Sequence, residues 1–144
     1  MIQGDKLYFN EIHKQRKAKS GIFLGVVLVL FIVYFLGLLL TSRIQGIVFW
    51  LYVAASIISF AAYGIDKNAA KHGKPRIRES TLQILALGGG WPGAWLAQTI
   101  LRHKTTKVSF QRVFVVTVFL NILGFIMYAS PAVSASILGL LGSV

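Results

Sequence analysis

The residues able to do chemistry in this chain are concentrated in two basic clusters, which lie on either side of an apolar, glycine-rich stretch. The first cluster includes Arg76 and Arg78, and the second begins at Arg102. A guanidinium offers forked N–H donors that match a phosphate, and lysine adds a compact positive charge. We therefore expect the clusters to bind an anionic head group. The cations assigned to this site are Arg76, Arg78, Arg102, Lys104 and Lys107.

Three side chains beside these cations could orient them. Asp66 and Glu79 can form ion pairs with the basic residues, and His103 adds a hydrogen-bonding ring. Ser80, His103 and Asp66 could be named as a nucleophile, a base and an acid, but no feature of the sequence brings them together. The catalytic residues therefore stay unknown, and we expect binding rather than catalysis.

Other kinds of site are excluded or unsupported. The chain has no cysteine, which excludes disulfides, thiolate nucleophiles and cysteine-ligated metals. His72 and His103 have no further ligand at metal-binding spacing, so we expect no metal. The glycines at 88–90 lack the preceding strand and the Lys-Ser/Thr pair of a phosphate-binding loop, so we expect no nucleotide cofactor.

The composition indicates an integral membrane protein. Of the 144 residues, 56% are hydrophobic and only 13% are charged, whereas soluble domains carry about 25% charged residues. The mean hydropathy is +0.70. A net charge of +11 would suggest nucleic-acid binding in a soluble protein. In a membrane protein it is typical of cytoplasmic loops and of contact with anionic lipid, so we expect no nucleic-acid partner.

The clusters must be positioned by membrane-spanning helices. A helix of twenty residues is about 30 Å long, which matches the hydrocarbon core of a bilayer. We expect an all-α polytopic protein with three to four transmembrane helices in one domain at 21–144. Residues 1–20 form a basic cytoplasmic arm, either a solvated tail or an interfacial helix, and 131–144 are too short to cross alone. The apolar segments are residues 21–40, 44–65, 81–101 and 113–130.

The third apolar segment is not an ordinary spanning helix. Pro92 has no amide hydrogen and would clash with the carbonyl of Gly88, while neighbouring glycines weaken the same turn. The segment is therefore either a kinked spanning helix or a re-entrant hairpin with its tip at 88–93. The residues expected to form the break are Gly88, Gly89, Gly90, Pro92 and Gly93.

The distribution of basic residues favours the hairpin. Cytoplasmic loops are enriched in Lys and Arg, so we place the amino terminus inside. If the third segment crosses the bilayer, ten Lys and Arg lie inside and five outside. If it turns back, fourteen lie inside and only Arg43 lies outside.

Several short motifs occur in a fixed order across about a third of the chain. They are Asp66-Lys67, then Arg76-Ile77-Arg78-Glu79, then Gly89-Gly90-Trp91-Pro92-Gly93-Ala94, and then Arg102-His103-Lys104-Thr105 with Lys107 and Phe110. This pattern, at about residues 63–114, resembles the bacterial membrane family catalogued as domain of unknown function 1294. The resemblance implies a small integral membrane protein and no particular reaction. We expect the protein to reside in the bacterial inner membrane.

Three functions follow as hypotheses. The first is binding of anionic lipid head groups or of a membrane partner through the basic clusters, for which the alternative is that the cations only set the topology. The second is a small transferase acting on a lipid substrate. The third is a transporter or channel subunit, which would need to form a homo-oligomer because four short helices are few for one transporter.

Overall fold

The chain is helical throughout the part that the structure describes. The computed structural model describes residues 2–102, 107–130 and 139, with the backbone alone at 2–7, 10 and 13–20. No strand occurs among these residues, which confirms the expected all-α class. The elements are α1 (Ile2–Leu40), α2 (Gly46–Lys71), α3 (Glu79–Leu85), the π-type turn η1 (Ala86–Gly90), α4 (Trp91–Leu101) and α5 (Val108–Ala129).

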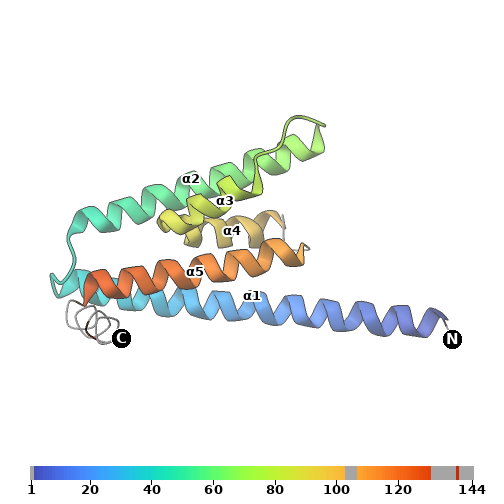
Figure 1. The fold of residues 1–144 in the computed structure, drawn as a ribbon, viewed down its shortest axis with the longest axis horizontal. Helices are drawn as coiled ribbons and strands as arrows, with labels where there is room; N and C mark the ends of the chain where they lie inside the picture. Colours follow the sequence, from blue (N-terminus) through green and yellow to red (C-terminus); the bar gives the residue numbers. More distant parts are fainter. Residues whose placement is uncertain (1, 103–106, 131–138, 140–144) are drawn as a thin grey trace.

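Three of the described helices are long and apolar enough to cross a membrane. The spans lie at Gly21–Leu40 within α1, at Gly46–Lys71 and at Val108–Ala129. Figure 1 shows these three long helices with the short α3 and α4 between them. The prediction of three full spans and one broken segment is therefore confirmed.

The basic arm is part of the first long helix. We predicted a helix at 21–40 preceded by a separate arm, whereas α1 is continuous from Ile2 to Leu40. Lys, Arg, Glu and Gln are good helix formers, so the loss of hydropathy before residue 21 does not end the helix. Leu24, Leu28 and Phe31 share one face of the helix and are buried against the rest of the molecule.

The second helix also continues beyond the predicted boundary. We placed its end at Ile65 and a basic loop from Asp66, but α2 extends to Lys71. The helix ends where Gly73 adopts a left-handed φ of 63°, a conformation that suits glycine. A charged residue marks the edge of the apolar stretch, but only the glycine ends the hydrogen-bonded helix.

The third apolar segment is a helical hairpin that turns back toward the end at which it began. Gly89 has a φ of 101°, which breaks the helix and reverses the chain between α3 and α4. Lys67 Nζ at the end of α2 donates to the carbonyl of Leu101 at the end of α4, at 2.7 Å. Lys107 Nζ at the start of α5 lies 2.8 Å from Glu79 at the start of α3. Both arms of the hairpin therefore reach the same end of the molecule (Figure 1).

The proline is not the residue that breaks the helix. Pro92 lies in the first turn of α4, where the backbone amide has no partner within the helix. The reversal occurs one turn earlier, at Gly89, where a positive φ is required. The predicted location of the break is correct, but the proline starts the returning helix instead of kinking a continuous one.

Glycines at the end of η1 and in the first turn of α4 allow the hairpin to lie directly against α2. A Cβ atom on Gly93 would lie 2.7 Å from Ser56 Cα, and one on Gly90 would lie 2.6 Å from the carbonyl oxygen of Ala55. Contacts this short exclude any side chain at either position. The hydroxyl of Ser59 is buried beside Gly90, where it has no hydrogen-bond partner.

Hydrogen bonds between side chains join the hairpin to the spanning helices. At the tip, Asn121 donates to the carbonyl of Leu87 at 2.6 Å and accepts a hydrogen bond from the Tyr52 hydroxyl at 2.9 Å. Nearer the open end, Gln98 donates to Tyr63 Oη at 3.1 Å. These bonds satisfy polar groups for which lipid offers no partner.

Candidate functional site

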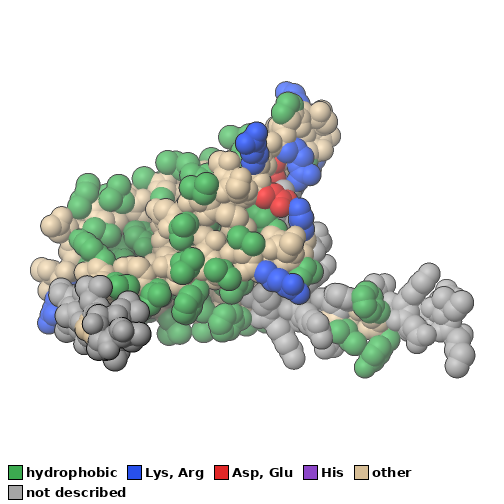
Figure 2. All heavy atoms as spheres, in the orientation of Figure 1, with side chains coloured by type: hydrophobic (Ala, Val, Ile, Leu, Met, Phe, Trp, Pro, Cys, Tyr) green, Lys and Arg blue, Asp and Glu red, His purple; other side chains and the backbone are tan. Residues whose placement is uncertain are grey.

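The basic side chains gather at one end of the molecule, which we call the cationic end. All the Lys and Arg side chains that the structure places, apart from Arg43, lie there. Figure 2 shows them as a group beside the two acidic residues, while hydrophobic side chains cover much of the remaining described surface. The cationic end comprises Lys67, Lys71, Lys74, Arg76, Arg78, Arg102, Lys107 and Arg112, with Asp66 and Glu79.

Asp66 is the buried anchor of this end. Its side chain is fully buried on α2, although we predicted a loop position. One carboxylate oxygen accepts the amide N–H of Ile77 at 3.0 Å, and the other lies 3.6 Å from the guanidinium of Arg76. The carboxylate therefore holds the segment between α2 and α3 against α2. Arg76 remains half exposed, so its outer face is open to solvent or to a ligand.

Two lysines join the ends of the hairpin to the spanning helices. Lys67 caps α4 by donating to the carbonyl of Leu101, at the negative end of that helix's dipole. Lys107 forms an ion pair with Glu79, in which both side chains are at least one-third exposed. The Lys107 pair adds little stability because water screens it. These contacts nevertheless fix where α3 begins and where α4 ends.

Arg78 and Arg102 are two arginines whose donors stay available, and Lys71, Lys74 and Arg112 are exposed likewise. Arg78 and Arg102 are both exposed, and neither forms an ion pair within the described part of the chain. Arg78 precedes the first residue of α3, and Arg102 follows the last residue of α4 in a left-handed conformation with a φ of 48°. The two arginines thus flank the open end of the hairpin.

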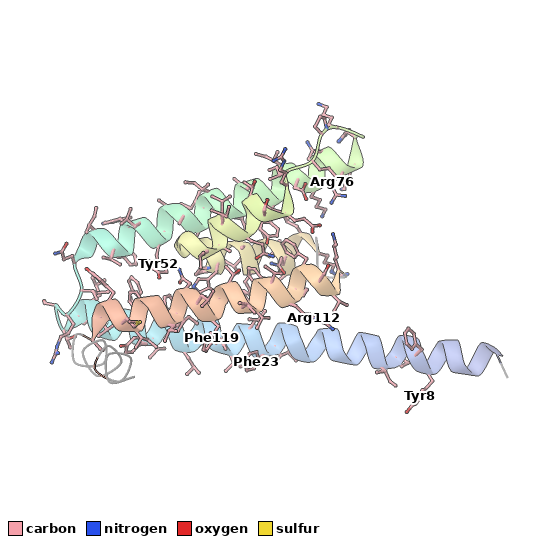
Figure 3. The ribbon with its side chains drawn as sticks, in the orientation of Figure 1. Tyr8, Phe23, Tyr52, Arg76, Arg112 and Phe119 are labelled. Atoms are coloured by element: carbon pink, nitrogen blue, oxygen red, sulfur yellow. The ribbon has the colours of Figure 1, made fainter. Side chains whose placement is uncertain are left out.

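The structure brings most of the predicted site residues to this one end. Figure 3 shows Arg76 near the end of α2 and Arg112 in the first turns of α5, both toward the cationic end. His103 and Lys104 lie outside the described residues. The predicted residues that meet here are Asp66, Arg76, Arg78, Glu79, Arg102 and Lys107, whereas Gly88, Gly89, Gly90, Pro92 and Gly93 form the opposite tip.

Sequence reasoning missed Gln98 and its polar partners inside the bundle. Gln98 is buried and lies between Tyr63 and Gln111, whose amide donates to it at 2.6 Å. A glutamine within an apolar segment is a recognisable signal, because polar groups in a membrane need a protein partner. The spacing of Tyr63 and Asp66 was a second signal, since residues three apart share a helix face.

An apolar groove lies near the tip of the hairpin. It has a volume of about 260 Å³ and opens between α1 and α2. Phe31 and Phe35 of α1 and Tyr52 of α2 form an aromatic wall, with ring centroids 5.4–5.7 Å apart. Pro92 contributes from the start of α4. We call this feature the tip groove.

Comparison with known proteins finds a family match over the hairpin and most of the cationic end. Residues 56–110 match the family described as "Protein of unknown function (DUF1294)". The match covers 55 of the chain's 144 residues. The match spans α2 from Ser56 onward, the whole hairpin and the start of α5.

A relative supports the same region. The uncharacterized protein YsdA of Bacillus subtilis (strain 168) is 39% identical over 59 residues, which cover 41% of this chain and 66% of that protein. The alignment thus spans just under two thirds of the relative's length. No solved structure matches the chain. The match confirms the resemblance and shows no activity.

Proposed function

We propose that this protein resides in the bacterial inner membrane and binds the anionic head group of a lipid at its cationic end. In this proposal the cationic end and the amino terminus face the cytoplasm. The orientation follows from the excess of Lys and Arg at one end, since such an excess is typical of the cytoplasmic side. Arg43 is the basic residue in the turn at the other end.

One observation carries the proposal. The hairpin returns Arg102 to the end at which Arg78 begins α3, and both guanidiniums are exposed. If the segment had crossed the bilayer, the two would lie about 30 Å apart, the thickness of the hydrocarbon core. Two forked donors at one interface suit the oxygens of a phosphate.

The neighbouring ion pairs support a specific site. Asp66 and Glu79 engage Arg76 and Lys107, which fixes the ends of the segments that carry the two exposed arginines. A site whose supports are held in place loses less conformational entropy when it binds a ligand. Cations that only set topology would need no such support.

The test compares two pairs of cations at the same end. The full-length protein in phosphatidylcholine nanodiscs is titrated with phosphatidylglycerol, and bound lipid is measured by native mass spectrometry. Arg78→Ala/Arg102→Ala removes the proposed contacts. Lys71→Ala/Lys74→Ala removes the same charge from exposed positions where α2 ends.

We expect the arginine pair to weaken binding much more than the lysine pair. A hydrogen bond to a charged group contributes about 1.5–3 kcal/mol, and we take the lower limit because both arginines are exposed. Losing both then costs about 3 kcal/mol and weakens binding by roughly 100-fold. The lysine pair should change affinity by less than about fivefold. Equal losses in the two variants would show that only overall charge matters, and the site would be rejected.

A further inference from the structure

We propose that the lipid held at the cationic end is a polyisoprenyl phosphate whose chain extends along α2 into the tip groove. This inference rests on the proposed function, because it assigns the phosphate to the same arginines. It adds the class of lipid, which follows from where the groove lies and from how far it is from those arginines.

The tip groove lies in the half of the bundle remote from the cationic end. Its α2 residues run from Phe49 to Ile57, within the first half of the helix that begins at Gly46. At 1.5 Å per residue, Tyr52 lies about 9 Å from the start of the helix and Ile57 about 17 Å. The groove is therefore at the depth of the hydrocarbon chains of the opposite leaflet.

The depth of the groove determines how long a lipid chain must be to fill it when the head group is bound at the cationic end. Ile57 lies nine residues before Asp66, or about 14 Å along the helix axis, and Phe49 lies about 26 Å from it. Half of the hydrocarbon core is about 15 Å thick. A lipid chain that stays in the leaflet of its head group thus reaches only the edge of the groove nearest the cationic end. Filling the groove requires a chain that crosses the midplane.

An apolar face of α2 joins the groove to the cationic end. Val53 and Ile57 line the groove, and one heptad further on the same face carries Phe60 and Gly64. A Cβ atom at Gly64 would meet nothing within 4 Å, so the surface is open at this residue, while Phe60 is partly buried against the core. Figure 1 shows α1 and α2 joined by a short turn and diverging toward the cationic end.

The walls of the groove are already assembled. Phe31 and Phe35 are less than a tenth exposed, and Phe35 stacks on Phe125 of α5 with an interplanar angle of 12°. Lipid tails are as apolar as the groove, so contact area alone gives no preference for binding in a bilayer. A preformed rigid wall can still gain dispersion contacts without ordering its own side chains. We therefore expect a modest preference for a chain that reaches it.

The experiment varies chain length while keeping the head group constant. The full-length protein in phosphatidylcholine nanodiscs is titrated with undecaprenyl phosphate, which can cross the midplane, and with farnesyl phosphate, which cannot. Val53→Phe fills the groove, and Ile57→Trp obstructs its rim as a second, lipid-exposed variant. Val116→Phe adds the same bulk on the exposed face of α5, away from the groove, and serves as the control.

We expect undecaprenyl phosphate to bind about tenfold more tightly than farnesyl phosphate, a difference of about 1.4 kcal/mol. Val53→Phe and Ile57→Trp should remove this difference in affinity and leave the affinity for farnesyl phosphate unchanged. The control Val116→Phe should keep the difference between the two lipids. Equal affinities in the unmodified protein, or a difference that persists in both groove variants, would overturn the inference while leaving the head-group site intact. Failure of both lipids to bind would reject the head-group site as well.

Discussion

Replacing Gly93 by alanine should force α4 away from α2 and destabilise the hairpin. The added methyl would lie 2.7 Å from Ser56 Cα and closer still to the Ser56 carbonyl oxygen, whereas ordinary van der Waals contact begins near 3.4 Å. The obstructing atoms belong to helix backbone, which cannot rotate aside. The two helices would therefore have to separate by at least about 0.7 Å.

The expected cost can be worked out from the contacts that the separation strains. Overpacking of a close interface costs about 1–3 kcal/mol. The same movement strains the bonds from Gln98 to Tyr63 and from Lys67 to the Leu101 carbonyl, and hydrogen bonds between membrane helices contribute about 0.6 kcal/mol each. The free energy of unfolding should therefore fall by about 2–4 kcal/mol.

This change in the free energy of unfolding can be measured by reversible unfolding in mixed micelles with increasing dodecyl sulfate. Tryptophan fluorescence follows the unfolding, because Trp91 is fully buried beside the hairpin turn. Gly64→Ala is the matched control. That glycine lies inside α2 with open space around it, so alanine should leave stability unchanged or raise it by up to about 1 kcal/mol. If Gly93→Ala unfolds like Gly64→Ala, the direct contact between α2 and α4 is refuted.

Three further predictions test the supports and the topology. Asp66→Asn keeps an oxygen for the Ile77 amide but loses the ion pair to Arg76, so unfolding should become easier by about 1–2 kcal/mol in the same assay; unchanged stability would show that the charge does not hold the loop. Asn121→Leu leaves the polar groups at the tip unpaired and should cost about 1 kcal/mol, again by micelle unfolding; a more stable variant would contradict this role. Because the chain has no cysteine, single cysteines introduced at exposed positions report sidedness through an impermeant thiol reagent. Lys74→Cys and Ser109→Cys should be labelled from the same side, and labelling of Ser109→Cys from the other side would mean that the hairpin segment crosses.

The sequence alone was sufficient for the class of protein and the position of the break. Apolar length and charge depletion are local properties, and they identified three spans within a few residues. The interruption near Gly89 was also readable, because a glycine run followed by Pro92 weakens any helix there. The count of basic residues favoured the return of α4 to the cationic end.

Three details depended on tertiary contacts. Asp66 looked like the first residue of a loop, yet it is buried in α2 because Arg76 and the Ile77 amide reach it from eleven or fewer residues away in sequence. The pairing of Gln98 with Tyr63 likewise joins residues 35 apart. The tip groove needs side chains from α1, α2 and α4 together.

A local sequence pattern indicates where a polypeptide chain can bend and which segments can enter a bilayer. It does not indicate which residues will form hydrogen bonds with a polar side chain or which helix faces will enclose a groove, because both depend on segments distant in sequence. The sequence therefore determined that this chain has three apolar segments long enough to span and an interrupted one between the second and the last of them. The tertiary structure decided that the interruption is a full reversal, because only packing of α4 on α2 through Gly90 and Gly93 turns a weak point into a hairpin.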